Sequence, residues 1–190
     1  IPACIKADTG ATFLASRGDQ WALEHGRPRG DNAYVVTQFP PIKVDRELRD
    51  GEVLKLDGAK LKVLSTPGHT PGCTSYLTDI ADDGKRLRVL FLCSITVAGN
   101  VLVGNKAYPT IAEDYRRTFA RLSGIKADIV LPSHPEWVDL IGKSRSKAQS
   151  GTNPFVDTHA LRRIVDAAHD FRHEPESDRG KHPEPKANGY

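Results

Sequence analysis

The sequence has no long apolar segment and no marked excess of charge of either sign. No apolar run in the 190 residues approaches the roughly 20 residues that a membrane-spanning helix requires. The 27 basic and 24 acidic side chains leave a net charge of +3, which is too small to predict binding to nucleic acid or to an acidic membrane. No signal peptide is recognisable after Ile1, and no internal repeat is present. These absences favour an ordinary globular domain without nucleic-acid or membrane partners.

Cysteine is scarce, with three residues at positions 4, 73 and 93 and no C-x-x-C pair. An odd number excludes a complete disulfide framework. We expect Cys93 to be a small buried apolar residue, because it lies in the apolar run RVLFLCSITV. Cys73 is expected to be a free thiol at the start of a strand, with a position near a metal as the alternative.

Turn and cap signals divide the chain into strands and helices. Gly10 predicts the end of a first helix, and Asp57-Gly58 and residues 82–84 predict hairpin turns. Thr110 followed by Glu113 predicts a capping box. The expected strands lie within 50–65, 74–97 and 127–134, with a short strand at 11–16. The expected helices lie within 16–26, 110–124 and 157–171.

This alternation favours a layered α/β (α+β) domain over residues 1–172. Residues 173–190 contain three prolines and no branched aliphatic residue, which is the composition of a polar C-terminal tail.

One histidine lies between two consecutive turns in residues 65–76, STPGHTPGCTSY. A Pro-Gly pair on each side of His69 restricts the backbone, because proline presets φ and glycine reaches conformations closed to other residues. Strand-like residues flank the turns on both sides, so we expect His69 on a tight loop between strands. A second histidine, His134, follows the predicted strand ADIVL. Loops at strand ends often meet at one edge of a layered fold and form sites there.

Four motifs in order resemble the C-terminal two thirds of a subclass B3 metallo-β-lactamase. They are STPGHTPGCTSY, CSITVAGN, GNKAYPTIAEDYRRTFARL and ADIVLPSHPEWVDL, and the resemblance runs from about Ile5 to about Phe171. It implies an αββα sandwich with a two-zinc site at one edge. His69 matches the third histidine of the first zinc site and His134 the histidine of the second.

The resemblance also implies a substrate and a location. Ser94 and Thr96 match the two hydroxyl positions that hold the carboxylate of a β-lactam, and we expect both on one face of the strand that reaches Val97. The irregular loop at 26–41 would overhang the substrate groove. Family members of this kind act in the periplasm or are secreted.

The chain departs from this family in one respect, because no H-x-H-x-D-H motif occurs in it. That motif supplies the other four zinc ligands in the family. We therefore expect residues 1–172 to be an incomplete metallo-β-lactamase domain, truncated at its N-terminus, with reduced or absent zinc binding and no β-lactam hydrolysis on its own.

Two alternatives stay open. A glyoxalase II-like thioester hydrolase also has the T-P-G-H-T-P-G motif, although such enzymes place a bridging aspartate where this chain has Ser94. The other alternative is a non-catalytic remnant that folds as a homodimer or larger oligomer through an exposed half-sheet.

Overall fold

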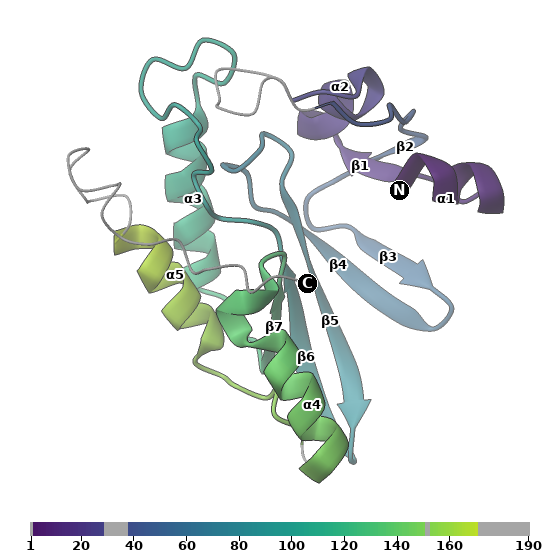
Figure 1. Cartoon of the computed structure of the whole chain (residues 1–190), viewed down its shortest axis with the longest axis vertical. Helices are drawn as coiled ribbons and strands as arrows, with labels where there is room; N and C mark the ends of the chain where they lie inside the picture. Colours follow the sequence, from purple (N-terminus) through teal and green to yellow (C-terminus); the bar gives the residue numbers. More distant parts are fainter. Residues whose placement is uncertain (1, 29–37, 151–152, 171–190) are drawn as a thin grey trace.

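The computed structural model describes residues 2–28, 38–150 and 153–170 as a mixture of helices and strands (Figure 1). Two early strands pair in parallel, and five later strands form one sheet in the order β3-β4-β5-β6-β7. Neighbours in this sheet are antiparallel, except that β6 and β7 are parallel. The elements are α1 (Pro2–Thr9), β1 (Leu14–Ser16), α2 (Arg17–His25), β2 (Arg46–Leu48), β3 (Val53–Leu56), β4 (Ala59–Ser65), β5 (Thr74–Asp82), β6 (Lys85–Leu92), α3 (Ile111–Ser123), β7 (Ile129–Pro132), the 3₁₀ helix η1 (Pro135–Val138), α4 (Leu140–Ser150) and α5 (Ala160–Asp170).

Both predicted hairpins are confirmed, and their turns explain their register. Asp57 and Gly58 have φ values of 43° and 85°, and Asp83 and Gly84 have φ values of 48° and 71°. Two central residues with positive φ match the twist of antiparallel strands. β3 and β4 pair around the first turn, and β5 and β6 pair around the second.

The predicted helix ends are confirmed, but the predicted capping box is not. Gly10 and Gly26 follow α1 and α2 with φ values of 68° and 65°, the left-handed conformation that glycine adopts without a steric cost. Thr110 precedes α3, but its side chain makes no cap hydrogen bond. Its hydroxyl instead donates to the Asp114 carboxylate at 2.8 Å, while Glu113 pairs with an arginine on the surface of the helix.

α3 and α5 cover one face of the five-stranded sheet and form the main core with it. Figure 1 shows the two helices side by side next to β7. Leu90 of β6 belongs to this core and has no exposed surface. Each helix contributes an apolar stripe that is buried in this core; the buried residues are Ile111, Tyr115, Phe119 and Leu122 in α3 and Leu161, Ile164 and Val165 in α5.

The opposite face of this sheet is less well covered. Phe91 follows Leu90 and points the other way because strand side chains alternate, and 40% of it is exposed. Ile80 of β5 is also 40% exposed, and Tyr76 pairs directly with Phe91. We call the side that carries Tyr76, Ile80 and Phe91 the open face. Part of it, around Val89, is covered by a smaller apolar cluster.

Several elements differ from the expectations. β6 ends at Leu92, so the predicted strand through Val97 is wrong over its last residues. β2 and α4 were not expected. The centre of the predicted overhanging loop, residues 29–37, and the predicted tail at 173–190 lie outside the described residues. No helix in the described ranges has the length and apolarity that crossing a membrane would require.

Candidate functional site

The His69 turn, which we define as residues 66–73, connects β4 to β5 and is anchored on α3. Gly68 has a φ of 141°, and a Cβ atom there would lie 2.7 Å from the Tyr115 ring, so only glycine fits. Thr118 donates to the Pro67 carbonyl oxygen at 2.6 Å. The structure confirms the predicted tight loop between strands, and these two contacts fix the backbone that precedes His69.

A continuous chain of hydrogen bonds joins His69 to His134 through the two predicted hydroxyls. His69 Nδ1 lies 2.9 Å from the Thr96 carbonyl oxygen and 3.3 Å from Thr96 Oγ1. Thr96 Oγ1 lies 2.9 Å from Ser94 Oγ, which lies 3.1 Å from His134 Nε2. The structure therefore brings together all four predicted site residues, from three segments far apart in the sequence.

His134 is oriented by two further side chains that follow it. β7 ends at Pro132, and η1 begins at Pro135, so His134 lies in the bend between them. Its Nδ1 lies 3.3 Å from a Glu136 carboxylate oxygen, and its ring stacks on Trp137 with the centroids 4.7 Å apart. A histidine that binds a metal through one ring nitrogen usually has its other nitrogen held in this way.

The hydroxyls are positioned differently from the prediction. Ser94 and Thr96 do not share a strand face, because they lie in the segment after β6. They still approach each other because Thr96 N donates to Ser94 Oγ at 3.3 Å, which closes a local turn.

A disulfide between Cys73 and Cys93 corrects the cysteine predictions. Cys73 is not a free thiol and Cys93 is not a simple apolar residue. The bond joins the end of the His69 turn to the residue before Ser94, and so connects two site segments covalently. Cys4, on the exposed surface of α1, is the free cysteine. An odd cysteine count does not exclude one disulfide, and the pairing depends on the fold rather than on the spacing in sequence.

The sequence also gave no indication of Asp19, a half-buried residue in the first turn of α2. Its carboxylate accepts hydrogen bonds from Thr70 Oγ1 and from Gly72 N, both at 2.9 Å. Partial burial raises the pKa of Asp19, and the hydrogen bonds from Thr70 and Gly72 oppose this. Tyr115 is a core residue of α3, and its hydroxyl donates to the Thr96 carbonyl oxygen at 2.5 Å.

The described residues do not by themselves form a zinc site. Within them, no three His, Cys, Asp or Glu side chains are grouped so that they could hold a metal ion. A catalytic zinc ion normally has three protein ligands. His69 and His134 are linked only through the two hydroxyls, and two imidazoles are fewer than the three ligands that one such centre requires.

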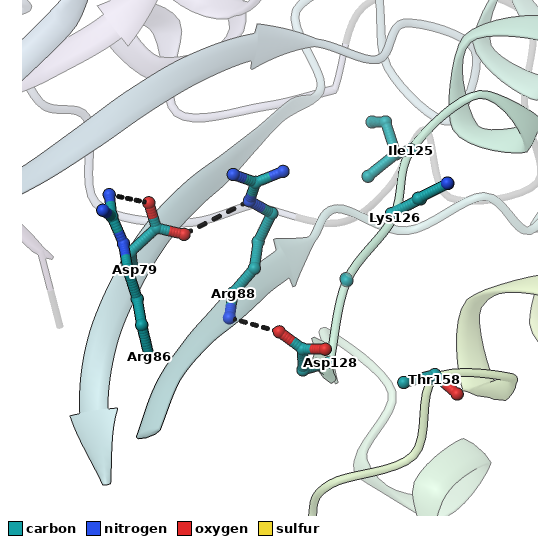
Figure 2. Close-up of a pocket in the computed structure, with 8 residues that line it drawn as sticks. Asp79, Arg86, Arg88, Ile125, Lys126, Asp128 and Thr158 are labelled. Atoms are coloured by element: carbon teal, nitrogen blue, oxygen red, sulfur yellow. Dashed lines mark hydrogen bonds and ion pairs between the residues drawn. The ribbon is translucent and has the colours of Figure 1, made fainter. Parts of the chain in front are cut away.

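A separate hollow of about 470 Å³ lies at the other end of β6 (Figure 2). Figure 2 shows Arg86 and Arg88 pairing with Asp79, while the Asp128 carboxylate accepts from Arg88 N. The hydrogen bond from Arg86 is the main reason that the pKa of Asp79 is lowered. The paired charges serve as cross-strand contacts, and neither site histidine lines the hollow.

Solved structures resemble this chain closely, although no protein-family model matches it. BJP-1, a subclass B3 metallo-β-lactamase of Bradyrhizobium japonicum, is 38% identical with a TM-score of 0.82, over 88% of this chain and 64% of that one. A Cronobacter sakazakii metallo-β-lactamase with a HARLDQ motif is 33% identical with a TM-score of 0.83, over 95% and 69%. The FEZ-1 metallo-β-lactamase from Legionella gormanii is 30% identical with a TM-score of 0.84, over 94% and 70%. The chain thus spans about two thirds of these proteins.

Proposed function

The chain belongs to the metallo-β-lactamases of subclass B3, and on that basis we propose that it is part of a zinc-dependent β-lactam hydrolase. In this proposal His69 supplies one ligand to a first zinc ion and His134 supplies one to a second. Ser94 and Thr96 hold the carboxylate of the β-lactam. The observation that carries the proposal is the chain of hydrogen bonds that joins these four residues.

The polar atoms around the histidines support the assignment of the ligand nitrogens. The Thr96 carbonyl oxygen can only accept, so His69 Nδ1 carries the proton and Nε2 is left with a lone pair. The Glu136 carboxylate is likewise an acceptor, so it favours the proton on His134 Nδ1. In each histidine Nε2 is therefore the nitrogen suited to a metal, and in His134 the Ser94 hydroxyl contacts it.

The remaining ligands must come from residues outside the 190, because the sequence contains no H-x-H-x-D-H motif. Bound zinc supplies a nucleophile from water at neutral pH and polarises a carbonyl group. The 190-residue chain should therefore hold well under two zinc ions per molecule after dialysis and should hydrolyse β-lactams at the background rate.

A fusion tests this function. An N-terminal segment of a subclass B3 relative that carries H-x-H-x-D-H is joined ahead of residue 1, and zinc content and hydrolysis of a cephalosporin and a carbapenem are measured. We expect two zinc ions per molecule and hydrolysis far above that of the 190-residue chain. In the same fusion His69→Ala should return hydrolysis to background, whereas His159→Ala, on the exposed surface before α5, should leave it unchanged.

Two outcomes would contradict the proposal. If the fusion binds two zinc ions but hydrolyses a glutathione thioester and no β-lactam, the glyoxalase II-like alternative is correct. If it folds and binds no zinc, His69 and His134 are not ligands, and the non-catalytic alternative is favoured.

The disulfide is relevant to the compartment in which the protein acts. Disulfides persist in the periplasm and outside the cell and are rare in a reducing cytosol. The Cys73–Cys93 bond therefore supports a periplasmic or secreted location as part of the proposal.

A further inference from the structure

The N-terminal end of α2 lies directly against the His69 turn. Gly18 and Gly72 meet at this junction, and a Cβ atom on either residue would overlap the opposite backbone or side chain. Ser16 Oγ donates to the Gly72 carbonyl oxygen at 2.6 Å. Figure 1 shows α2 near the loop between β4 and β5, at the end of the sheet where β5 begins. Glycine at both positions is what lets the helix and the turn approach so closely.

Two side chains that could cap α2 contact the turn instead. Ser16 is the N-cap residue, but its side chain makes no cap hydrogen bond. Asp19, three residues later, would complete a capping pair by bonding back to Ser16. Its two carboxylate oxygens instead accept from Gly72 N and Thr70 Oγ1. The helix thus lacks the local stabilisation of an N-cap hydrogen bond, and both side chains contact the turn.

The two contacts of Asp19 fall on the half of the turn that follows His69. The half that precedes it is held by α3, through Thr118 and the Tyr115 ring. The imidazole itself is held by the Thr96 carbonyl oxygen. Without Asp19, both Thr70 Oγ1 and Gly72 N would lose their acceptor. The backbone after the imidazole would then be held by Ser16, by the Cys73–Cys93 disulfide and by hydrogen bonds within the turn.

We propose that Asp19 is a positioning residue for His69. Its carboxylate fixes Thr70 and Gly72, which keeps the imidazole on the Thr96 carbonyl oxygen and leaves Nε2 free for a metal. The relevance to zinc rests on the proposed function, but the effect on the imidazole does not. It can be measured in the 190-residue chain without any metal.

The test compares three variants by long-range proton–nitrogen NMR of the His69 ring, at a pH where the imidazole is neutral. Asp19→Ala removes both acceptors, so His69 should change from one Nδ1–H tautomer to a mixture of tautomers. Asp19→Asn keeps an oxygen for Gly72 N and offers an amide group to Thr70 Oγ1, so it should retain the native tautomer. Glu24→Gln, on the same helix but facing Val44 N, is the matched control and should have no effect.

The outcomes separate positioning from a general loss of stability. A purely structural role would lower the unfolding midpoint of Asp19→Ala and leave the His69 tautomer of the folded molecules unchanged, which would overturn the proposal. If Asp19→Ala does not fold, Thr70→Val and Thr70→Ser replace it. The valine variant should alter the His69 signals and the serine variant should not, and equal signals in both would overturn the proposal.

A second readout uses the fusion described above. Asp19→Ala should weaken Co²⁺ binding by about tenfold, the lower range for residues that support metal ligands, and Asp19→Asn should bind nearly as the parent does. A fusion that binds no metal would contradict the proposed function but would not affect the NMR test of Asp19. Equal Co²⁺ binding by the parent and by Asp19→Ala would show that Asp19 does not support the ligand.

Discussion

Ser94 lies in the middle of the hydrogen-bonded chain between the two histidines and is almost completely buried, with 6% of its surface exposed. Its hydroxyl contacts Thr96 Oγ1 and His134 Nε2 in the described residues. If His134 Nε2 binds a metal, as proposed, that contact would be lost and the hydroxyl would be free for another acceptor. A substrate carboxylate is such an acceptor, and a hydrogen bond to a charged group contributes about 1.5–3 kcal/mol.

Changing Ser94 to Ala in the active fusion should therefore weaken substrate binding and leave bond breaking largely intact. We expect KM for a cephalosporin to rise about tenfold, with a much smaller change in kcat, because the interaction is made equally in the ground and transition states. The matched control is the methyl ester of the same cephalosporin. The ester carries no carboxylate, so the parent and the variant should hydrolyse it with similar KM values. A fall in kcat with unchanged KM would assign Ser94 to the reaction itself.

At the scale of the elements, the disulfide connects the turn before β5 to the segment after β6. It closes a loop with a sequence separation of 20, and Cys73 is only 2% exposed. The chain-entropy treatment assigns about 3 kcal/mol of stabilisation to a loop of this length. The same bond limits how far the His69 turn can move from Ser94.

Removal of this disulfide should lower the free energy of unfolding by about 3 kcal/mol. The variant Cys73→Ala/Cys93→Ala is compared with the parent by urea unfolding, with Cys4→Ala present in both to prevent thiol exchange. Cys4→Ala alone should be neutral, because Cys4 is exposed on α1. Equal unfolding of the parent with and without reductant, after the thiols are shown to be free, would contradict this expectation.

Features that depend on one or two neighbouring residues could be predicted from the sequence, whereas contacts between distant residues could not. Asp57-Gly58 and Gly10 were predicted correctly because a positive φ at a turn or helix end depends on one or two residues. The Cys73–Cys93 bond was missed although the hairpin of β5 and β6 was predicted, because the register of the two strands and the path of the chain beyond them decide which side chains meet. The Ser16-to-Asp19 spacing resembles an ordinary helix start, and nothing local reveals that both side chains contact residues more than fifty positions away.

The candidate site likewise depends on contacts between segments that are distant in the sequence. The resemblance placed His69, His134, Ser94 and Thr96 together, and the hydrogen bonds join them. Neither spacing nor periodicity could have done so, since three separate segments contribute. The end of β6 at Leu92 was also missed, because the apolar run through Val97 continues after the ladder with β7 has ended.

At the scale of the whole molecule, the described residues cover the open face of the sheet only in part. Its centre is Phe91, beside Tyr76 on β5, and Ile80 lies nearby on the same strand. Phe91 and Ile80 are each 40% exposed, whereas Leu90 on the other face has no exposed surface. Exposed apolar side chains gathered on one surface are typical of an interface.

In the 190-residue chain we expect a second copy of the chain to cover this face. The population of dimers and larger species should rise with protein concentration in sedimentation or light-scattering measurements. Phe91→Lys should shift the molecule toward the monomer, because a lysine ammonium in the contact would have to be desolvated. Val103→Lys is the control; Val103 is more exposed, at 87%, but lies in the loop before α3, away from the sheet. A chain that stays monomeric at every concentration, or a Val103→Lys effect as large as that of Phe91→Lys, would show that the open face does not mediate self-association.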